Sequence, residues 1–491
     1  MTQRKAIVIG AGLGGIALAI RLQSAGFATT LLEARDKPGG RAYVYEDQGF
    51  VFDAGPTVIT DPASLEELFA LSGRRMADYV EMLPVAPFYR LCWEDGYSFD
   101  YADDQEALDR QIHAISPADV AGYRNFLRYS QEVLEEGYVK LGTVPFLSFR
   151  SMVQAGPQLA RLQAWRSVYS MVSRFIQNER LRQVFSFHSL LVGGNPFATS
   201  SIYTLIHALE RRWGVWFPKG GTGALVRGLV RLFEDLGGTL QLNSPAERIE
   251  TDNGRVVGVR VNGVQLPADT VASNADVVHT YERLLGHVPR GVQEARRLRR
   301  KRFSMSLVVV HFGLRAQHPL QHHTVCFGAR YKELIGEIFR GPLAKDFSLY
   351  LHAPCVTDPS LAPPGCASHY VLAPVPHLGH ADLDWEQEGP RYRDRIFDYL
   401  EQRYIPHLRR DLVTSRIFTP TDFRDQLGAH LGSAFSLEPV LTQSAWFRAH
   451  NRDGQIPNLY LAGAGTHPGA GVPGVIGSAK ATARLMLEEL P

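Results

Sequence analysis

Two strand–glycine–helix units, one near each end of the chain, constrain the fold more than any other feature of the sequence. Residues 6–9 (AIVI) read as a buried parallel strand, followed by a G-x-G-x-x-G turn and a predicted helix over residues 16–25. The second unit begins near Ile456 and contains the run NLYLAGAGTHPGAGVPGVIGSAKATARLMLEEL. Both units have the order of parts that binds a dinucleotide at the edge of a parallel sheet. We therefore expect an α/β fold with a Rossmann-like domain to which both ends of the chain contribute.

Each glycine of the first unit has a predicted task. Gly10 permits the tight turn, Gly12 lets the backbone approach a pyrophosphate, and Gly15 lets the helix pack closely on the strand. The free N–H groups at the start of the helix favour a phosphate. Residues 29–32 form the next strand, and Glu33 at its end is placed to bind ribose hydroxyls.

The separation of the two units indicates the class of cofactor. Nicotinamide enzymes complete this fingerprint in one unit, whereas this chain returns to it more than 400 residues later. That return predicts FAD, bound noncovalently as a built-in redox cofactor, and argues against NAD(P) as a substrate. Two further turns should pass beside FAD. They are DKPGGR with Gly40 and Arg41, where Arg41 can pair with pyrophosphate, and FDAGPT with Gly55 and Pro56.

At 491 residues the chain is long enough for two or three intertwined domains. Residues 1–85, 224–285 and 440–491 are predicted to form a discontinuous FAD-binding domain. Residues 86–106 and 286–439 should form an inserted mixed α+β domain that binds the substrate. Residues 107–223 read as a mostly helical region that contacts the substrate and a membrane.

Composition limits the cellular compartment and the kinds of partner that we expect. The net charge is only +2, and the four cysteines form no C-x-x-C motif, which fits a reducing cytoplasm without disulfides and predicts no metal site. No apolar run reaches the roughly 18 residues of a membrane span, so any membrane contact should be peripheral. The basic run 296–302 would permit nucleic-acid binding on charge alone, but we expect a helix end or a lipid contact there and no nucleic-acid partner.

The C-terminal run GAGTHPGAGVPG resembles the signature of bacterial-type carotenoid desaturases, a branch of the amine-oxidase-like flavoproteins. The interior runs FSFHSLLVGGNPFATSSIYTLIHALE and SAFSLEPVLTQSAWF share the resemblance, which covers the entire chain and is greatest to the lycopene-forming phytoene desaturases. The resemblance implies FAD as the only redox cofactor. It also implies successive dehydrogenations of 15-cis-phytoene through carotene intermediates to lycopene, each by hydride transfer to flavin N5 and then proton loss.

The same resemblance assigns contacts to individual positions. It implies that Gly12 and Gly15 face the pyrophosphate and Glu33 the ribose. It implies contacts of Ala246 with adenine through its backbone, and of Gly465, Val475 and Ile476 with the ribityl chain and ring.

Few polar residues are candidates for the chemistry, since an allylic cation needs no strong base to lose a proton. His467 in the C-terminal motif is one candidate, with a role in orienting the loop as the alternative. Glu438 lies in an apolar run and would have a raised pKa if buried, although a structural ion pair is the favoured reading. Arg150 is a third candidate, with a place at the membrane surface as its alternative.

Segment 138–187 interleaves basic and aromatic residues, which suits the headgroup region of anionic lipids. We therefore expect peripheral attachment to the cytoplasmic face of the cell membrane, with oxygen or a quinone as the terminal electron acceptor. A solvated basic face of a helical bundle is the alternative for this segment. For the whole chain the alternatives are a carotenoid oxidase or isomerase, another amine-oxidase-like flavoenzyme, and a carotenoid carrier without redox activity.

Overall fold

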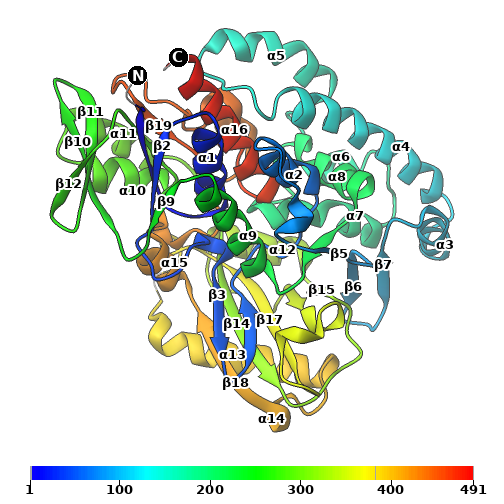
Figure 1. The fold of residues 1–491 in the computed structure, drawn as a ribbon. Coiled ribbons are helices and arrows are strands. Elements are labelled where there is room, and N and C mark those ends of the chain that lie inside the picture. The colour runs from blue at the N-terminus through cyan, green and yellow to red at the C-terminus, as the bar shows by residue number, and fades with distance from the viewer. Residues whose placement is uncertain (1–2, 382, 490–491) are drawn as a thin grey trace.

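The computed structural model describes residues 3–381 and 383–489 of the chain, and its centre is a five-stranded parallel sheet (Figure 1). The first and last parts of the chain meet in this sheet, because β13 pairs with β1 on one side and with β19 on the other. The order across the sheet is β19 (Leu459–Leu461), β13 (Thr270–Ser273), β1 (Lys5–Ile9), β2 (Ala28–Leu32) and β9 (Thr239–Gln241). The predicted α/β fold with a Rossmann-like domain, to which both ends of the chain contribute, is therefore confirmed.

Helix α1 (Leu13–Ser24) begins three residues earlier than the sequence predicts. The amide of Ile16 already donates to the carbonyl of Gly12 (2.9 Å), so Gly14 and Gly15 belong to the first helical turn. Gly15 has no room for a side chain, since a Cβ there would lie 1.9 Å from the carbonyl oxygen of Gly10. Helix α1 packs against α9 (Thr222–Asp235) and α16 (Val472–Glu489), which join the middle and the end of the chain to the start.

A second, seven-stranded sheet lies below the first in Figure 1. Successive side chains along each strand point to opposite faces of the sheet, and both faces are buried. Val308, Val310 and Phe312 pack against α13 (Trp385–Arg403), whereas Leu307 and Val309 face the interior cavity. The order is β18 (Leu412–Phe418), β14 (Ser306–Leu314), β17 (Ala367–Val375), β16 (Leu349–His352), β15 (His323–Phe327), β6 (Tyr89–Trp93) and β7 (Ser98–Tyr101).

Residues 105–213 are mainly helical and lie beside both sheets. Among the described residues, no helix has both the length and the apolar character to cross a bilayer. The helices are α3 (Gln105–Ile115), α4 (Asp119–Val133), the π-helical turn Leu134–Lys140, α5 (Phe149–Arg161), α6 (Val168–Val172), α7 (Glu179–Ser186) and α8 (Leu205–Trp213).

Smaller elements complete the two sheet regions. The three-stranded sheet has the order β10 (Ala246–Asp252), β11 (Arg255–Val261) and β12 (Val264–Pro267). Strands β3 (Val44–Asp47) and β4 (Phe50–Asp53) form a hairpin, and β5 (Met82–Pro84) pairs antiparallel with the distant β8 (Trp216–Pro218). The remaining helices are α2 (Pro62–Ala70), α10 (Val277–His279), α11 (Pro289–Arg299), α12 (Tyr331–Arg340), α14 (Leu408–Asp411) and α15 (Pro420–Leu427).

The strands of the two larger sheets come from separate parts of the chain. All five strands of the parallel sheet lie within residues 1–85, 224–285 and 440–491. All seven strands of the second sheet lie within residues 86–106 and 286–439. The helices named above for residues 105–213 fall almost entirely in the range 107–223.

Asp53 connects the N-terminal segment to α9 through a buried cap. Its Oδ1 accepts hydrogen bonds from the amides of Thr222 (2.8 Å) and Gly223 (3.4 Å). The N-cap residue of the helix, Gly221, has no side chain with which to cap it. Burial raises the pKa of Asp53 to about 7, against the lowering effect of these two amides.

This raised pKa predicts a pH-dependent stability. Asp53 is protonated in the folded protein below about pH 7 and ionises near its ordinary value of 3.8 in the unfolded chain. The folded state should therefore lose stability as the pH rises from about 4 to about 7, by on the order of 4 kcal/mol. Asp53→Asn keeps the accepting oxygen but cannot ionise. The difference in unfolding free energy between parent and variant should change across this window in denaturant titrations, and a constant difference would contradict the assignment.

Candidate functional site

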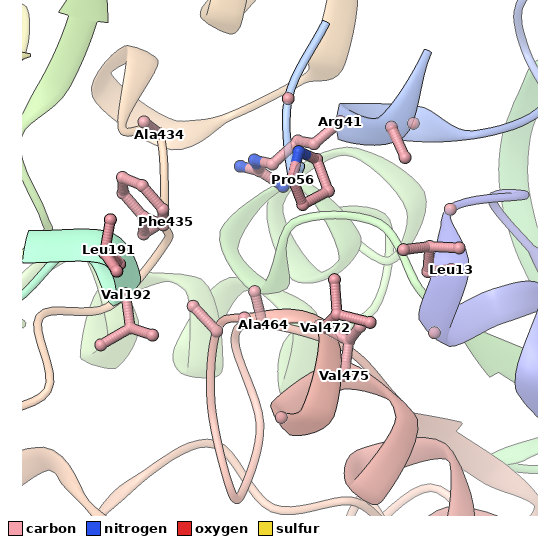
Figure 2. Close-up of a pocket in the computed structure, with 18 of the residues that line it drawn as sticks. Leu13, Arg41, Pro56, Leu191, Val192, Ala434, Phe435, Ala464, Val472 and Val475 are labelled. Carbon is pink, nitrogen blue, oxygen red and sulfur yellow. The ribbon is translucent and has the colours of Figure 1, made fainter. Parts of the chain in front are cut away.

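A cavity of about 720 Å³ runs from the carboxyl edge of the parallel sheet to the inner face of the seven-stranded sheet. Figure 2 shows the junction between its two ends, where α1, the segments of Arg41 and Pro56, and the start of α16 converge. The polar end is built from the predicted nucleotide-binding segments. The other end is apolar and is lined by both the sheet and the helical region.

The polar end has a carboxylate at the tip of β2. Glu33 is buried and accepts hydrogen bonds from the amides of Ala11 (3.0 Å) and Arg35 (2.9 Å). Burial raises the pKa of Glu33, and these amides oppose the rise. Gly10 and Ala246 line the same end, so the predicted ribose and adenine residues lie together.

Close approach of two glycine segments shapes the start of α1. The amide of Gly39 donates to the carbonyl of Ala11 (2.7 Å), and a Cβ on Gly40 would lie 3.2 Å from the Cα of Gly12. Side chains at these positions would fill the space over the N-terminus of α1, where the backbone N–H groups are free to bind a phosphate. The glycine pair after the ribose carboxylate therefore keeps this end open.

Arg41 supplies the positive charge at the junction. Its Nη2 donates to the carbonyl of Ser433 (3.3 Å), and its shielded Nε has no hydrogen-bond partner within the described part of the chain. Burial lowers the pKa of Arg41, and the nearby Asp276 counteracts this. In Figure 2 the guanidinium projects into the open space next to Pro56. A shielded guanidinium with an unused N–H is suited to bind an anionic group such as pyrophosphate.

The C-terminal motif forms the wall opposite Arg41. Val472 and Val475, in the first turn of α16, point toward the open space in Figure 2, and Ala464 lies beside them. Gly55 and Pro56 line the facing side. These positions agree with the predicted arrangement of the two chain ends around one cofactor.

Three predicted cofactor contacts lie outside the cavity lining, and each has a packing reason. Gly15 is placed against the Gly10 carbonyl, so it serves helix packing and does not face the cavity. Gly465 is buried, and a Cβ on it would lie 2.4 Å from Cγ1 of Val277. Ile476 is 1% exposed and packs in the core around α1, because consecutive helix residues point in different directions.

The apolar end of the cavity is suited to a long hydrocarbon. Aliphatic and aromatic side chains from the two sides of the chamber face one another, and polar groups are few. The sheet contributes Leu307, Val309, Val325, Leu372, Tyr350 and Tyr370, and the helical region contributes Met152, Leu159, Phe187, Leu191, Leu205 and Leu209. Burial of such a ligand would be stabilised by removal of its apolar surface from water.

His467 lines the cavity, and its ring is held in place. Its Nε2–H donates to the carbonyl of Leu141 (2.9 Å), so Nδ1 carries the free lone pair. Phe146 packs edge-on against the ring, with 4.9 Å between centroids. Burial lowers the pKa of His467 to about 4, so the imidazole is neutral near pH 7 and is a weak base. These contacts favour the alternative role, in which His467 orients the C-terminal loop.

The other two catalytic candidates lie away from the cavity. Glu438 is 2% exposed and forms an ion pair with Arg302 (2.7 Å), which is the structural role that the sequence already favoured. Burial raises the pKa of Glu438, and Arg302 opposes the rise. Arg150 is exposed in the first turn of α5. Neither residue is among those that line the cavity, so this geometry gives no support to a catalytic role for them.

The cavity instead contains an acid that the sequence reading overlooked. Glu210 on α8 is 0% exposed and lines the apolar end. Its Oε1 accepts a hydrogen bond from the hydroxyl of Tyr89 (2.7 Å), and its Oε2 lies 3.0 Å from Nε2 of His188. Glu210 and His188 both occur in the run FSFHSLLVGGNPFATSSIYTLIHALE. The sequence signal for Glu210 was a charged residue at the end of an apolar helical stretch.

Comparison with known proteins places this site in a family. Residues 13–487 match the family described as flavin containing amine oxidoreductase. A phytoene desaturase (lycopene-forming) of Pseudescherichia vulneris is 69% identical over 490 residues, which are 99% of this chain and 100% of the relative. A protein of the same description from Pantoea ananas is 68% identical over 486 residues, covering 98% and 99%. The chain belongs to the phytoene desaturases of this flavoprotein family.

One solved structure is similar to this chain in fold, at low sequence identity. Cyclohexylamine oxidase from Brevibacterium oxydans IH-35A has a TM-score of 0.65 at 18% identity, with 99% of each chain covered. Family membership makes FAD the cofactor, and the cavity fits it. The adenosine, pyrophosphate and flavin parts of FAD would be held by Glu33, the glycine segments, Arg41 and the start of α16.

The packing of Gly465 leads to a rescue prediction. Gly465→Ala should destabilise the fold by about 1–3 kcal/mol and reduce bound FAD, because the new methyl group meets Val277. Val277→Ala removes the methyl groups in conflict, so the double variant should recover most of the FAD content. Unfolding titrations and flavin absorbance of the four proteins measure both effects. Strictly additive losses would show that Gly465 is constrained by something other than Val277.

Proposed function

We propose that the protein desaturates 15-cis-phytoene to lycopene through successive carotene intermediates, with FAD as the redox cofactor. The observation that carries this proposal is the apolar chamber that opens onto the nucleotide-binding end of the same cavity. A hydrocarbon substrate has no polar group to recognise, so shape and burial must position it. The printed names of the two bacterial relatives support the same substrate and product.

The chain's own residues position the substrate and exclude water. When bound, FAD supplies the acceptor for the two electrons of the C–H bond that breaks. Leu191, Val192 and Phe435 lie between the chamber and the start of α16 in Figure 2, where they would align a polyene beside the cofactor. Their apolar surfaces keep this junction dry, which prevents water from adding to a cationic carbon.

We assign Glu210 as the base: its carboxylate accepts the proton that leaves the carbon next to the one that loses the hydride. The carboxylate is fully buried in the apolar end of the cavity; Tyr89 donates a hydrogen bond to its Oε1, and Nε2 of His188 lies 3.0 Å from its Oε2. The other lining acids are differently placed. Glu33 and Asp276 belong to the nucleotide-binding end, and Asp425 is exposed and paired with Arg424. Glu210 is thus the acid best placed to accept a proton at an Oε atom.

A product assay tests the proposed function. Purified protein with FAD, phytoene in liposomes, and either oxygen or an added quinone should consume phytoene and form lycopene, resolved by chromatography. Bound but unchanged phytoene with every acceptor would indicate a carrier. A change of double-bond geometry alone would indicate an isomerase, and oxygen-containing products an oxidase. Oxidation of amines without reaction of phytoene would indicate an amine oxidase.

Glu210→Gln should slow lycopene formation by about 100-fold or more, the usual loss when a general acid or base is removed. FAD content should be retained, since Gln can still accept from Tyr89. Asp425→Asn, which neutralises an exposed acid of the same lining, is the matched control and should keep the parent rate. Stopped reactions quantified by chromatography give both rates. Equal rates for the parent and Glu210→Gln would remove Glu210 from the mechanism.

We also propose that α5 and its flanking residues attach the protein peripherally to the cytoplasmic face of the cell membrane. Four large apolar side chains of residues 139–165 are exposed: Val139, Phe149, Val153 and Trp165. Trp165 is 63% exposed. Helix α5 itself contributes Met152 and Leu159 to the cavity lining. Helix α5 therefore connects an apolar surface with the chamber, as extraction of a substrate from lipid requires.

The attachment surface is narrower than segment 138–187. Phe185 and Phe187 are buried in the core, so they cannot contact lipid. Arg182 pairs with Glu179 (3.6 Å), and Arg161 pairs with Glu132 (3.2 Å). Because these neighbouring acids offset part of the positive charge, apolar contact should matter more than the sequence predicts.

Replacing Phe149, Val153 and Trp165 with Ser should reduce co-sedimentation with liposomes and slow lycopene formation, while FAD content stays at the parent level. Leu71→Ser and Val264→Ser together form the control, because these side chains are exposed but lie in other parts of the chain (46% and 61%). Anionic and neutral vesicles at low and high salt separate charge from apolar contact. Unchanged sedimentation of the triple variant would mean that α5 is a solvated helix face.

A further inference from the structure

Three buried histidines meet behind the wall of the cavity, and the proposed reaction uses none of them. His323 is the first residue of β15 and pairs with His352, the last residue of β16, while His322 directly precedes β15. All three are at most 3% exposed. One ligand nitrogen of each lies within 4.8 Å of those of the other two. The ring of His323 packs against Tyr350 and that of His352 against Tyr370, and both tyrosines line the cavity.

The hydrogen bonds around the cluster leave nitrogen lone pairs unused. Nδ1–H of His323 donates to the carbonyl of Phe88 (3.0 Å), so its Nε2 carries the lone pair. Nδ1 of His322 contacts the hydroxyl of Thr357. Nε2 of both residues and both ring nitrogens of His352 have no hydrogen-bond partner among the residues that the structure describes. Buried nitrogens without partners are costly, and three rings that carry them lie together here.

The bond from His323 to a backbone carbonyl is the outer contact that commonly orients a metal-binding histidine.

We propose that His322, His323 and His352 bind one divalent transition-metal ion, with Zn²⁺ as the best match, and that the ion links the start of β15 to the end of β16. Three imidazoles suit Zn²⁺, with a water molecule as the fourth ligand. The nitrogens need only a small inward shift, since Zn–N distances are about 2.0–2.1 Å. The ion would brace the sheet behind Tyr350 and Tyr370 and would not contact the substrate.

The expectation of no metal site rested on cysteine spacing, which cannot reveal a cluster of histidines. His322 and His323 lie 29 or more residues before His352 in the sequence, and strand pairing brings the three together. The proposed site is independent of the proposed desaturation, so each can fail without the other.

Metal analysis of untagged, FAD-containing protein tests the site. The protein is treated with a chelator, dialysed against Zn²⁺ and then against metal-free buffer, and its metal content is measured by plasma mass spectrometry. We expect one Zn²⁺ per chain and an increase in melting temperature on Zn²⁺ addition. His352→Phe should weaken Zn²⁺ binding by about 100-fold or more and abolish the increase in melting temperature.

His369→Phe is the matched control, because His369 is equally buried in the same sheet but stacks on Phe312 outside the cluster. This variant should keep one Zn²⁺ per chain. FAD absorbance verifies that each variant is folded. If His352→Phe does not fold, Co²⁺ added to the parent protein should still give the long-wavelength bands of a nitrogen-ligated ion. Substoichiometric Zn²⁺ in the parent, or the same Zn²⁺ content in folded His352→Phe, would overturn the proposal and leave three packed neutral imidazoles.

Discussion

The insertion of β13 between β1 and β19 is the constraint on which the rest of the structure depends. It fixes three distant parts of the chain in one parallel sheet, with Val271 paired to both Ile7 and Leu459. The carboxyl edge of that sheet then receives Gly10 from one end of the chain and the loop before α16 from the other. Everything that builds the site, from the ribose carboxylate to the wall around Val475, is positioned by these backbone ladders.

The cavity combines two environments that ordinarily exclude each other. Its nucleotide-binding end concentrates backbone N–H groups and the Arg41 charge, whereas the chamber beyond is apolar. A charged group in such surroundings is costly unless it is paired. In the apolar end, Glu210 has two polar neighbours, the hydroxyl of Tyr89 at 2.7 Å from Oε1 and Nε2 of His188 at 3.0 Å from Oε2.

The sequence predicts those parts of the site in which neighbours along the chain are also neighbours in space. The glycine turn, the carboxylate after β2 and the second nucleotide unit follow fixed local spacing, and the fold class and family were therefore predictable. Gly465 and Ile476 were misplaced because a motif does not reveal which side of a turn or helix faces a cavity. Glu210 and the histidine cluster arise from contacts between distant segments, such as the pairing of His323 with His352.

The discontinuous order of the parallel sheet has a consequence for biosynthesis. Strands β1 and β2 and helix α1 are synthesised well before β13, which emerges more than 200 residues later, and β19 follows later still. One edge of β1 therefore stays unpaired until β13 is made, a state that is prone to misfold in long chains. Because the start of α16 completes the cavity lining, tight FAD uptake should follow the synthesis of α16, and bound flavin should then stabilise the folded chain.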